Sequence, residues 1–232
     1  MVHDVLADRA RQMWVELAGV PVSFPDNGIE VVTSAASRLC PPGWAGIVVI
    51  ADSGIATIPS GGLVAGLAGL PIEAVRDVAR VRAALKPADT LGPATLAYLD
   101  RPDFTPAPGP VERLPADHED VLRLVASVSA EDAGECGLDE ITSPAFVVRS
   151  GADIVAAAGY CRWPGRIAHL GVLTGTAHRG RGLAALAASA AVEDALRHGW
   201  LPQWRARPPA SRRVAGRLGF RELGVQLSLR FA

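Results

Sequence analysis

The sequence predicts an α+β protein made of two units, and three observations support this prediction. The stretch from Arg101 to Pro110 contains four prolines and one glycine, so neither a helix nor a central strand can run through it. Runs of branched residues alternate with longer helix-like segments on both sides of this stretch. Downstream of it, three apolar runs follow one another with only short turns between them, which is typical of an antiparallel meander. We therefore expect an N-terminal α+β domain over residues 1–104, a linker over 105–110 and a second domain over 111–232.

The first unit combines helical and strand patterns. A helical segment opens it, and a longer one is interrupted at Pro71. Runs rich in branched residues predict strands, two of which lie close enough around Ser53–Gly54 to form a hairpin. The expected elements are helices over Val5–Leu17 and Gly61–Leu85, and strands over Ile29–Val32, Gly46–Ile50, Ile55–Ile58 and Thr95–Leu99. No motif in this unit indicates a reaction.

The second unit has a clearer order of elements. An amphipathic helix precedes the meander, and an alanine-rich helix follows it and ends at Gly199. The expected strands are Val111–Leu114, Ala145–Arg149, Ile154–Cys161, Ile167–Thr174, Gln203–Ala206, Phe220–Leu223 and Gln226–Phe231, and the expected helices are Asp117–Val128, Gly180–His198 and Ala210–Leu218.

Composition narrows the class of protein. The chain has 232 residues, of which 49% are hydrophobic, and a formal net charge of -1, so nothing points to a nucleic-acid or membrane surface. No run of about 20 apolar residues is present. Cys40, Cys136 and Cys161 are odd in number and widely spaced, which favours neither a disulfide framework nor a metal site. We therefore expect a cytoplasmic protein with buried thiols and no metal.

The stretch His178–Ala184 is the most informative motif. It places two glycines and two arginines where a strand passes into a helix. Backbone amides at such a turn lie at the positive end of the helix dipole, and glycine allows an anion to approach them closely. The turn therefore predicts a phosphate site. It is not a Walker motif, because it lacks a lysine, and it does not follow the first strand of a parallel βαβ unit as a dinucleotide fingerprint does.

These residues resemble the GNAT superfamily of acyl-CoA-dependent N-acyltransferases. The family signature RxxGxG/A is met by Arg179-Gly180-Arg181-Gly182-Leu183-Ala184, and Leu170–His178 resembles the strand and loop that precede it. Ala210–Phe220 resembles the closing helix that ends in Gly-Phe. The resemblance covers roughly residues 111–232. It implies a mixed, mostly antiparallel sheet flanked by helices in this part of the chain.

The resemblance also implies a site for acetyl-CoA as cosubstrate. Amides of the turn would hold the pyrophosphate, with charge from Arg179 and Arg181. The pantetheine arm would run along the preceding strand, which would splay from Gln203–Ala206, and a strand amide near Leu170–Val172 would stabilise the oxyanion. The implied cofactor-binding residues are Val172, Leu173, Thr174, Arg179, Gly180, Arg181, Gly182, Leu183, Ala184 and Ser211. A primary amine would attack the thioester directly in a ternary complex, without an acyl-enzyme.

The proton of the incoming amine needs an acceptor. His169 is the candidate base, because it lies on the same strand and an ordinary imidazole pKa suits the task; the alternative is a histidine with a structural role only. Asp139 and Glu140 are candidates for substrate carboxylates or a solvated loop, and His178 for a surface or cofactor contact. A tyrosine common among relatives as the acid for the thiolate is absent, since Ala215 follows Ser211 at that distance, and an expected asparagine is replaced by Pro208. Tyr160 is an unlikely substitute.

Several alternatives remain open at this stage. The leading hypothesis is an N-acetyltransferase acting on an unidentified primary amine. The second is a non-catalytic acyl-CoA-binding or interaction module, and the third is a scaffold that no longer binds CoA. The first unit is expected to cap the acceptor site, to mediate homodimer contacts or to be a degenerate copy of the GNAT fold. Trp163, Trp200 and Trp204 are expected at the edge of the site, where packing and recognition are both open roles.

Overall fold

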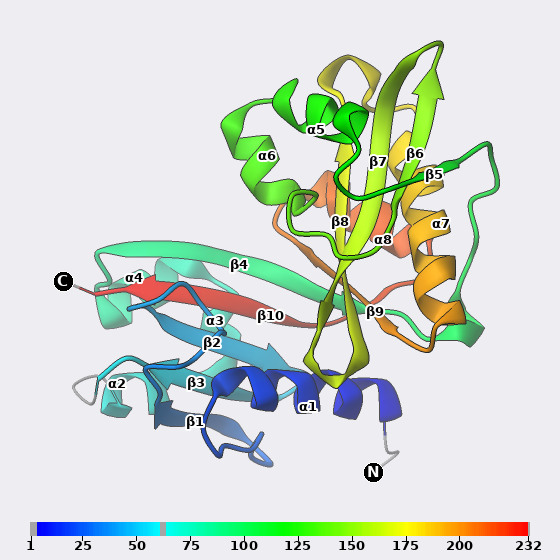
Figure 1. Ribbon diagram of the computed structural model, residues 1–232. Helices are drawn as coiled ribbons and strands as arrows, with labels where there is room; N and C mark the ends of the chain where they lie inside the picture. Colours follow the sequence, from blue (N-terminus) through cyan, green and yellow to red (C-terminus); the bar gives the residue numbers. More distant parts are fainter. Residues whose placement is uncertain (1–3, 61–63, 232) are drawn as a thin grey trace. The chain divides into compact units, whose positions relative to one another are not determined.

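The computed structural model describes residues 4–60 and 64–231, which form two compact units (Figure 1). Within these residues, unit 1 consists of the chain up to Ala97 together with Ala206–Pro208 and the stretch from Glu222. Unit 2 consists of Tyr98–Arg205 and Pro209–Arg221. Both units combine helices with a mostly antiparallel sheet, so the predicted fold class is confirmed. No helix in the described ranges is long and apolar enough to cross a membrane.

Unit 1 has strands in the order β1-β3-β2-β10-β4, with β1 and β3 parallel and β2 antiparallel to both β3 and β10. Its first helix begins where the Asp4 carboxylate accepts hydrogen bonds from two backbone amides and ends at Gly19. The elements are α1 (Val5–Ala18), β1 (Gly28–Thr33), β2 (Ala45–Ile50), β3 (Ser53–Ile58), α2 (Val64–Ala68), α3 (Ile72–Val75), α4 (Val78–Leu85), β4 (Asp89–Tyr98) and β10 (Arg221–Arg230).

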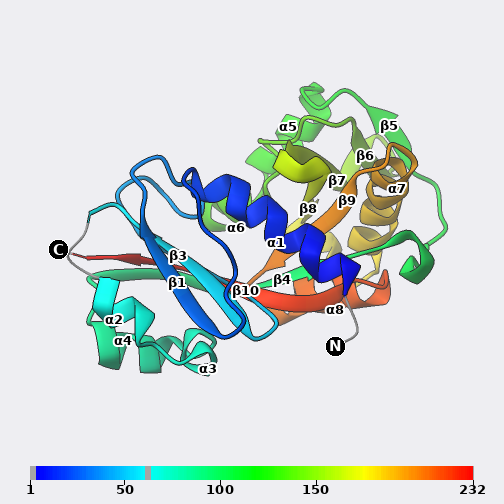
Figure 2. The same cartoon turned by 90° about the horizontal axis from the view of Figure 1, so that it is seen from below.

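The sheet of unit 1 carries helices on both faces. Figure 2 shows α1 on one face and α2, α3 and α4 on the other. One apolar cluster joins side chains of β2, β3 and β10 to those of the three short helices. Ile47, Leu67, Val81 and Leu227 are fully buried members of this cluster. Burial of this face holds the short helices, which are too brief to be stable alone.

Three expectations for unit 1 are adjusted by the structure. The long helical segment is three helices, and the predicted start at Gly61 lies outside the described residues. The hairpin turns at residues 51–52, because Ile50 pairs with Ser53, so Gly54 lies inside β3. The last strand begins at Asp89, six residues before the predicted start at Thr95.

Unit 2 has strands in the order β9-β8-β7-β6-β5, and only β8 and β9 are parallel. The predicted meander is confirmed as β6, β7 and β8. The elements are β5 (Glu112–Leu114), α5 (Glu119–Ala126), α6 (Ala130–Cys136), β6 (Ala145–Ser150), β7 (Asp153–Trp163), β8 (Ile167–Thr174), α7 (Leu183–Arg197), β9 (Leu201–Ala206) and α8 (Pro209–Arg217). Helix α6 was not expected; most of its residues are polar or exposed, and Cys136 is its buried residue.

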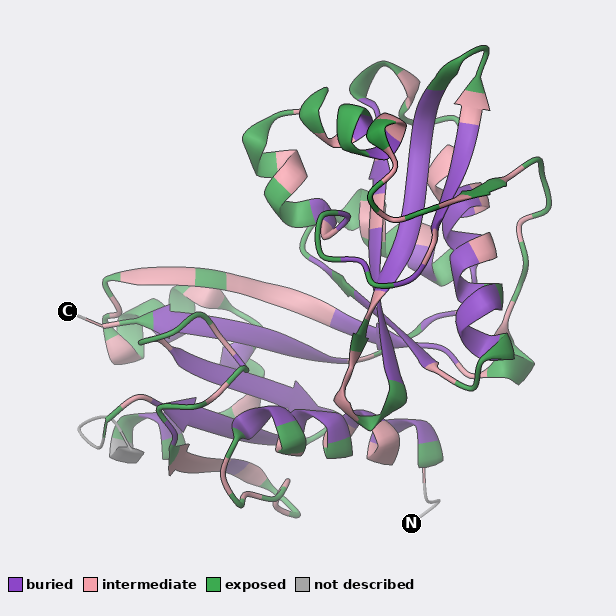
Figure 3. Cartoon of the chain, in the orientation of Figure 1, coloured by how far each residue is buried: buried purple, intermediate pink, exposed green. Residues whose placement is uncertain are grey.

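Helices cover both faces of the sheet in unit 2. Helices α5 and α6 lie on one face and the alanine-rich α7 on the other, where it contacts β6, β7 and β8 (Figure 1). Fully buried alanines such as Ala187, Ala188 and Ala191 let the axis of α7 lie close to the strands. Figure 3 shows the strands buried along most of their length and the outer turns of α5 and α6 exposed. The sheet therefore positions β8 between two helical layers.

The end of the chain differs from the expected division at residue 111. Two final strands were expected in the second domain, but residues 221–230 form one strand, β10, which pairs with β2 over Gly224–Leu229. The apolar side chains of Val225, Leu227 and Leu229 belong to the core of unit 1. Burial of this apolar face explains why the C-terminal stretch belongs to the unit that starts the chain.

The proline-rich stretch also differs from the expected linker at 105–110. The boundary between the units falls at Tyr98, and the stretch is tied to helices of unit 2. The Thr105 amide donates to the Leu218 carbonyl at 3.0 Å, and the Ala107 amide donates to the Ser189 hydroxyl at 2.9 Å. Prolines have no amide donor, so these non-proline residues supply the hydrogen bonds that hold the segment.

Candidate active site

The first feature of the site is the point where β8 and β9 part. The two strands pair in parallel from Ile167–Leu201 to His169–Gln203, and the register stops there. Strand β8 stays paired with β7 on its other side as far as Thr174. The edge of β8 that faces β9 is therefore open to a new partner after His169, as in β-strand addition.

The second feature is the glycine-arginine turn at the start of α7. Gly180 and Gly182 have φ values of 77° and 80°, in the left-handed region where a side chain is strained. A Cβ at either position would meet no atom within 4 Å, so the space in front of the turn is open. No side chain caps the first turn of α7, which leaves its amides, among them those of Leu183 and Ala184, without the usual capping acceptor. This arrangement favours an anion.

The two arginines of the turn make contacts within unit 2. Arg179 donates from Nε to the Thr174 carbonyl at 3.3 Å and forms an ion pair with Asp132 of α6 at 2.9 Å. Hydrogen bonds from Arg179 and Ser129 hold the pKa of Asp132 below its ordinary value. Arg181 donates to the Ala177 carbonyl at 3.3 Å. Arg179 therefore joins α6 to the end of β8 and remains next to the predicted phosphate site.

The predicted strand residues lie along the parted edge. Leu173 is buried in the cluster with α5 and α6, whereas Val172 and Thr174 are half-buried on the opposite face. The Thr174 hydroxyl oxygen is buried and has no hydrogen-bond partner among the described residues. A buried hydroxyl without a partner is costly, so this atom is a candidate contact for a polar group of a ligand.

His169 lies at the point of divergence and is buried. Its Nδ1 is 3.0 Å from the Gln203 side-chain oxygen, and its ring stacks on Trp163 with centroids 4.1 Å apart. Gln203 in turn donates from Nε2 to the Tyr98 hydroxyl at 3.0 Å. Sequence reasoning identified His169 but missed Gln203 and Tyr98 as its partners. Gln203 was visible only as a polar residue in a strand pattern, and Tyr98 had no signal.

The pKa of His169 differs from the expected ordinary value. The pKa is lowered to about 3, mainly by burial and also by the nearby Arg205 guanidinium, while the Gln203 hydrogen bond opposes the shift. The imidazole is therefore neutral at physiological pH. The neutral ring can accept a hydrogen bond, but the imidazolium form is too acidic to persist at neutral pH.

This shift predicts a pH-dependent stability. The unfolded chain takes up a proton on His169 below about pH 6.5, whereas the folded protein does so only near pH 3. The folded protein is therefore expected to lose stability as the pH falls from 6.5 towards 3, by a few kcal/mol at about 1.4 kcal/mol per pKa unit. Urea unfolding of the wild type and of His169→Asn at neutral and acidic pH measures this. Equal pH dependence in both proteins would contradict the prediction.

The other candidate residues named from the sequence lie in a loop, in α8 and in β7. Asp139 and Glu140 are exposed in the loop before β6, and Glu140 is near enough to help raise the pKa of Cys161, mainly raised by burial. Ser211 accepts a hydrogen bond from the Trp204 indole at 2.9 Å, which links α8 to β9. Tyr160 faces α7 instead, where its hydroxyl donates to Asp194 at 2.9 Å.

Burial and the Asp194 contact raise the pKa of Tyr160 to about 12, which makes it a poor proton donor. The three tryptophans named above differ in role. Trp163 stacks on His169, Trp204 packs edge-on against Phe220, and Trp200 lies under the guanidinium groups of Arg162 and Arg166. Only Trp163 contacts the candidate base.

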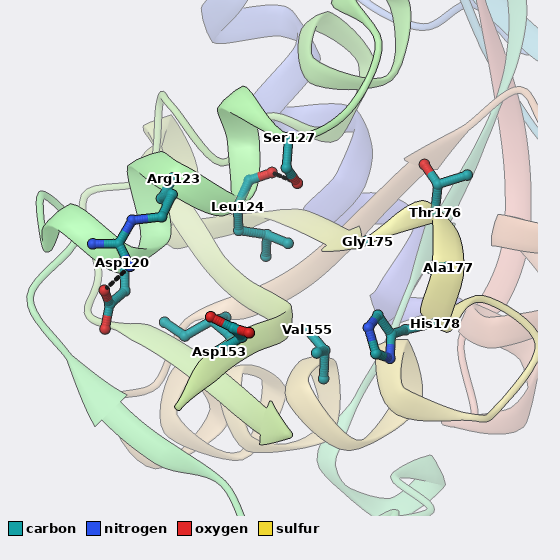
Figure 4. Close-up of a pocket in the computed structure, with 11 residues that line it drawn as sticks. Asp120, Arg123, Leu124, Ser127, Asp153, Val155, Gly175, Thr176, Ala177 and His178 are labelled. Atoms are coloured by element: carbon teal, nitrogen blue, oxygen red, sulfur yellow. Dashed lines mark hydrogen bonds and ion pairs between the residues drawn. The ribbon is translucent and has the colours of Figure 1, made fainter. Parts of the chain in front are cut away.

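A cavity of about 400 Å³ lies next to the segment that follows β8 (Figure 4). Its walls come from α5, the start of β7 and residues 175–178, and His178 lines it. Arg123 and Asp120 form an ion pair at 2.8 Å at one end. None of the residues that line this cavity belongs to β8 or β9.

The parted strands and the uncapped start of α7 lie in the same α+β unit, unit 2. A family model described as GNAT acetyltransferase matches residues 143–224, and this match confirms the resemblance seen in the sequence. A comparison with curated protein sequences gives no match.

Solved structures similar to this chain include three GNAT proteins. One is a GCN5-related N-acetyltransferase from Kribbella flavida, with 19% identity over 67% of this chain and 64% of that chain and a TM-score of 0.49. Another is an acetyltransferase from the GNAT family from Colwellia psychrerythraea, with 13% identity over 67% of this chain and 62% of that chain and a TM-score of 0.47. The third is a tandem GNAT protein from the clavulanic acid biosynthesis pathway, with 17% identity over 80% of this chain and 63% of that chain and a TM-score of 0.42. Each alignment spans less than two thirds of the solved chain.

Proposed function

We propose that this protein transfers an acetyl group from acetyl-CoA to a primary amine. The observation that carries the proposal is the end of the β8–β9 register at His169–Gln203. The rest of β8, residues 170–174, continues from there towards the open glycine turn. A thioester arm needs an extended edge and its phosphates need an anion site, and both belong to one continuous segment of the chain.

The proposed cosubstrate site uses the residues of that segment. The pyrophosphate would lie against the amides of residues 179–184, whose glycines leave open space. The arm would pair with the free edge of β8 at residues 172–174, next to the unpartnered Thr174 hydroxyl. Ser211 of α8 completes the proposed set. The bound cosubstrate supplies an activated acyl group, and a β8 amide near Leu170–Val172 would stabilise the negative charge on its carbonyl oxygen.

The proposed role of His169 follows from its low pKa. The amine nitrogen attacks the thioester carbon, the carbon–sulfur bond breaks and the amine loses a proton. His169 would accept a hydrogen bond from the attacking amine or from an intervening water, and the proton would pass on to solvent, because the imidazole holds it poorly. The thiolate is protonated by water in the absence of a tyrosine at Ala215.

The test separates binding from transfer. Calorimetry with CoA measures cosubstrate binding, and incubation with labelled acetyl-CoA and a panel of small amines and amine-bearing peptides measures transfer. We expect micromolar to millimolar affinity for the cosubstrate and labelled product with at least one amine. CoA binding without transfer to any amine would overturn the proposal.

A second candidate function is a non-catalytic acyl-CoA-binding module. It is favoured by the absence of the tyrosine, since Ala215 is buried and non-polar, and by the weak basicity of His169. Binding insensitive to His169→Asn, with no turnover, would support it.

The three free cysteines and the absence of a disulfide among them are compatible with the proposed cytoplasmic location. Homodimer formation by the chain is also proposed and is measured by mass in solution.

A further inference from the structure

Three buried polar side chains are hydrogen-bonded in series next to the point where β8 and β9 part. Tyr98 and Gln203 are fully buried, and His169 is 8% exposed. Two hydrogen bonds of 3.0 Å link the Tyr98 hydroxyl to the Gln203 amide and the amide to the His169 ring. His169 and Gln203 are the last residues in the parallel register. The series of hydrogen-bonded side chains therefore ends at the start of the proposed thioester site.

The direction of these bonds determines the tautomer of His169. The Gln203 nitrogen donates to the Tyr98 hydroxyl, which turns the amide oxygen towards His169. An amide oxygen only accepts hydrogen bonds, so the Nδ1 atom next to it must carry the proton. The lone pair of the neutral ring is then on Nε2.

The surroundings favour the neutral ring. The ring stacks on Trp163 at an interplanar angle of 17°, and the Arg205 guanidinium also lies over the Trp163 ring, 5.8 Å from its centroid. The charged or titratable groups that face this region are Arg205 of β9, Glu140 of the loop before β6, Tyr98 of β4 and Cys161 of β7, which pairs with His169. Glu140 acts on Arg205 and Cys161, whereas Arg205 acts on His169.

We propose that Gln203 and Tyr98 are positioning residues that hold His169 in the Nδ1-protonated form, so that Nε2 is the atom that accepts a hydrogen bond from the acceptor amine. The inference rests on the proposed acetyl transfer for its catalytic part. If Gln203 and Tyr98 served packing alone, their polar atoms would not need to point towards His169, which lies where β8 and β9 part. Tyr98 acts through Gln203, which in turn acts through His169.

The test uses the whole chain labelled with nitrogen-15 histidine. Long-range proton–nitrogen spectra distinguish the two neutral tautomers, and the His169 signal is assigned by its loss in His169→Asn among the five histidines of the chain. We expect a single Nδ1-protonated form in the wild type and a mixture of tautomers in Tyr98→Phe. Tyr160→Phe is the matched control, because it also removes one hydroxyl from a fully buried tyrosine but on the face of β7 that meets α7.

Kinetics supply the second measurement. Tyr98→Phe and Gln203→Leu are expected to lower kcat about ten-fold without changing CoA affinity, whereas Tyr160→Phe is expected to leave kcat unchanged. Gln203→Glu is expected to raise the pH at which His169 titrates, because a carboxylate favours the charged ring.

The outcomes separate this inference from the proposed function. An active protein whose His169 carries its proton on Nε2, or whose tautomer is unaffected by Tyr98→Phe, overturns the inference alone. The same change of tautomer in Tyr160→Phe also overturns it. Absence of transfer to every amine overturns the proposed function and, with it, the catalytic role of the two positioning residues.

Discussion

Gly182→Val is expected to weaken CoA binding by about 100-fold while the protein remains folded. Gly182 is the N-cap of α7, and its φ of 80° is one that a β-branched residue does not adopt without strain. Relief of the strain would turn the amides of the first turn away from the proposed phosphate site. Loss of two charge-assisted hydrogen bonds, each worth about 1.5 kcal/mol or more, corresponds to this factor. Calorimetry with CoA measures it.

Gly151→Val is the matched control for this variant. Gly151 has a φ of 64° in the exposed turn between β6 and β7, and a Cβ there would also meet no atom within 4 Å. Both variants are therefore expected to lose a similar free energy of unfolding, about 1–2 kcal/mol. Only Gly182→Val is expected to lose CoA affinity. Equal affinities in the two variants would show that the turn does not hold the phosphates.

His169→Asn is expected to lower kcat about 100-fold and to leave CoA affinity within about two-fold of the wild type. Asparagine retains a donor for Gln203 but lacks a ring nitrogen that accepts from the amine. Because the imidazole is neutral at every pH well above 3, the factor is expected to be constant through the neutral and alkaline range. Steady-state kinetics with saturating amine at several pH values measures it.

His198→Asn is the control for the loss of a histidine. His198 lies at the C-terminal end of α7, where its ring contacts the Asp194 carbonyl, and its side chain is largely exposed. Its replacement is expected to leave kcat unchanged. A kcat for His169→Asn equal to that of the control would remove His169 from the reaction. A loss that shrinks as the pH falls through 7 would indicate a base with an ordinary pKa instead, because protonation of that base would inactivate the wild type.

Local patterns were enough to predict most elements of unit 2. Strand alternation, the alanine-rich helix and the turn residues Gly180 and Gly182 are all set by neighbours within a few positions. The exceptions have local causes. Helix α6 has little apolar periodicity, so it was missed. Gly224 interrupts the pattern of the last strand, but it lies in β10 opposite Ile50, where a Cβ would collide with the Val49 carbonyl. A glycine that looked like a break therefore marks a close approach of two strands.

The environment of His169 was beyond any local pattern. Tyr98 and Gln203 are 105 positions apart in the sequence, and the hydrogen bond between them exists only because the fold of unit 2 brings the two residues together. Burial and the nearby Arg205 guanidinium lower the His169 pKa, which was expected from the sequence to be ordinary. The same limit applies to β10, because the choice between two sheets depends on which apolar face buries it.

Local patterns in the sequence were enough to predict the glycine-arginine turn and the meander before it, because backbone preference and side-chain periodicity act over a few residues. They also carried the resemblance to the GNAT superfamily, whose family model matches residues 143–224. The point where β8 and β9 part, the atoms around His169 and the unit that receives the last strand could be learned from the folded structure alone. These features depend on contacts between residues far apart in the chain, and their free energies arise from burial and pairing that no short segment contains.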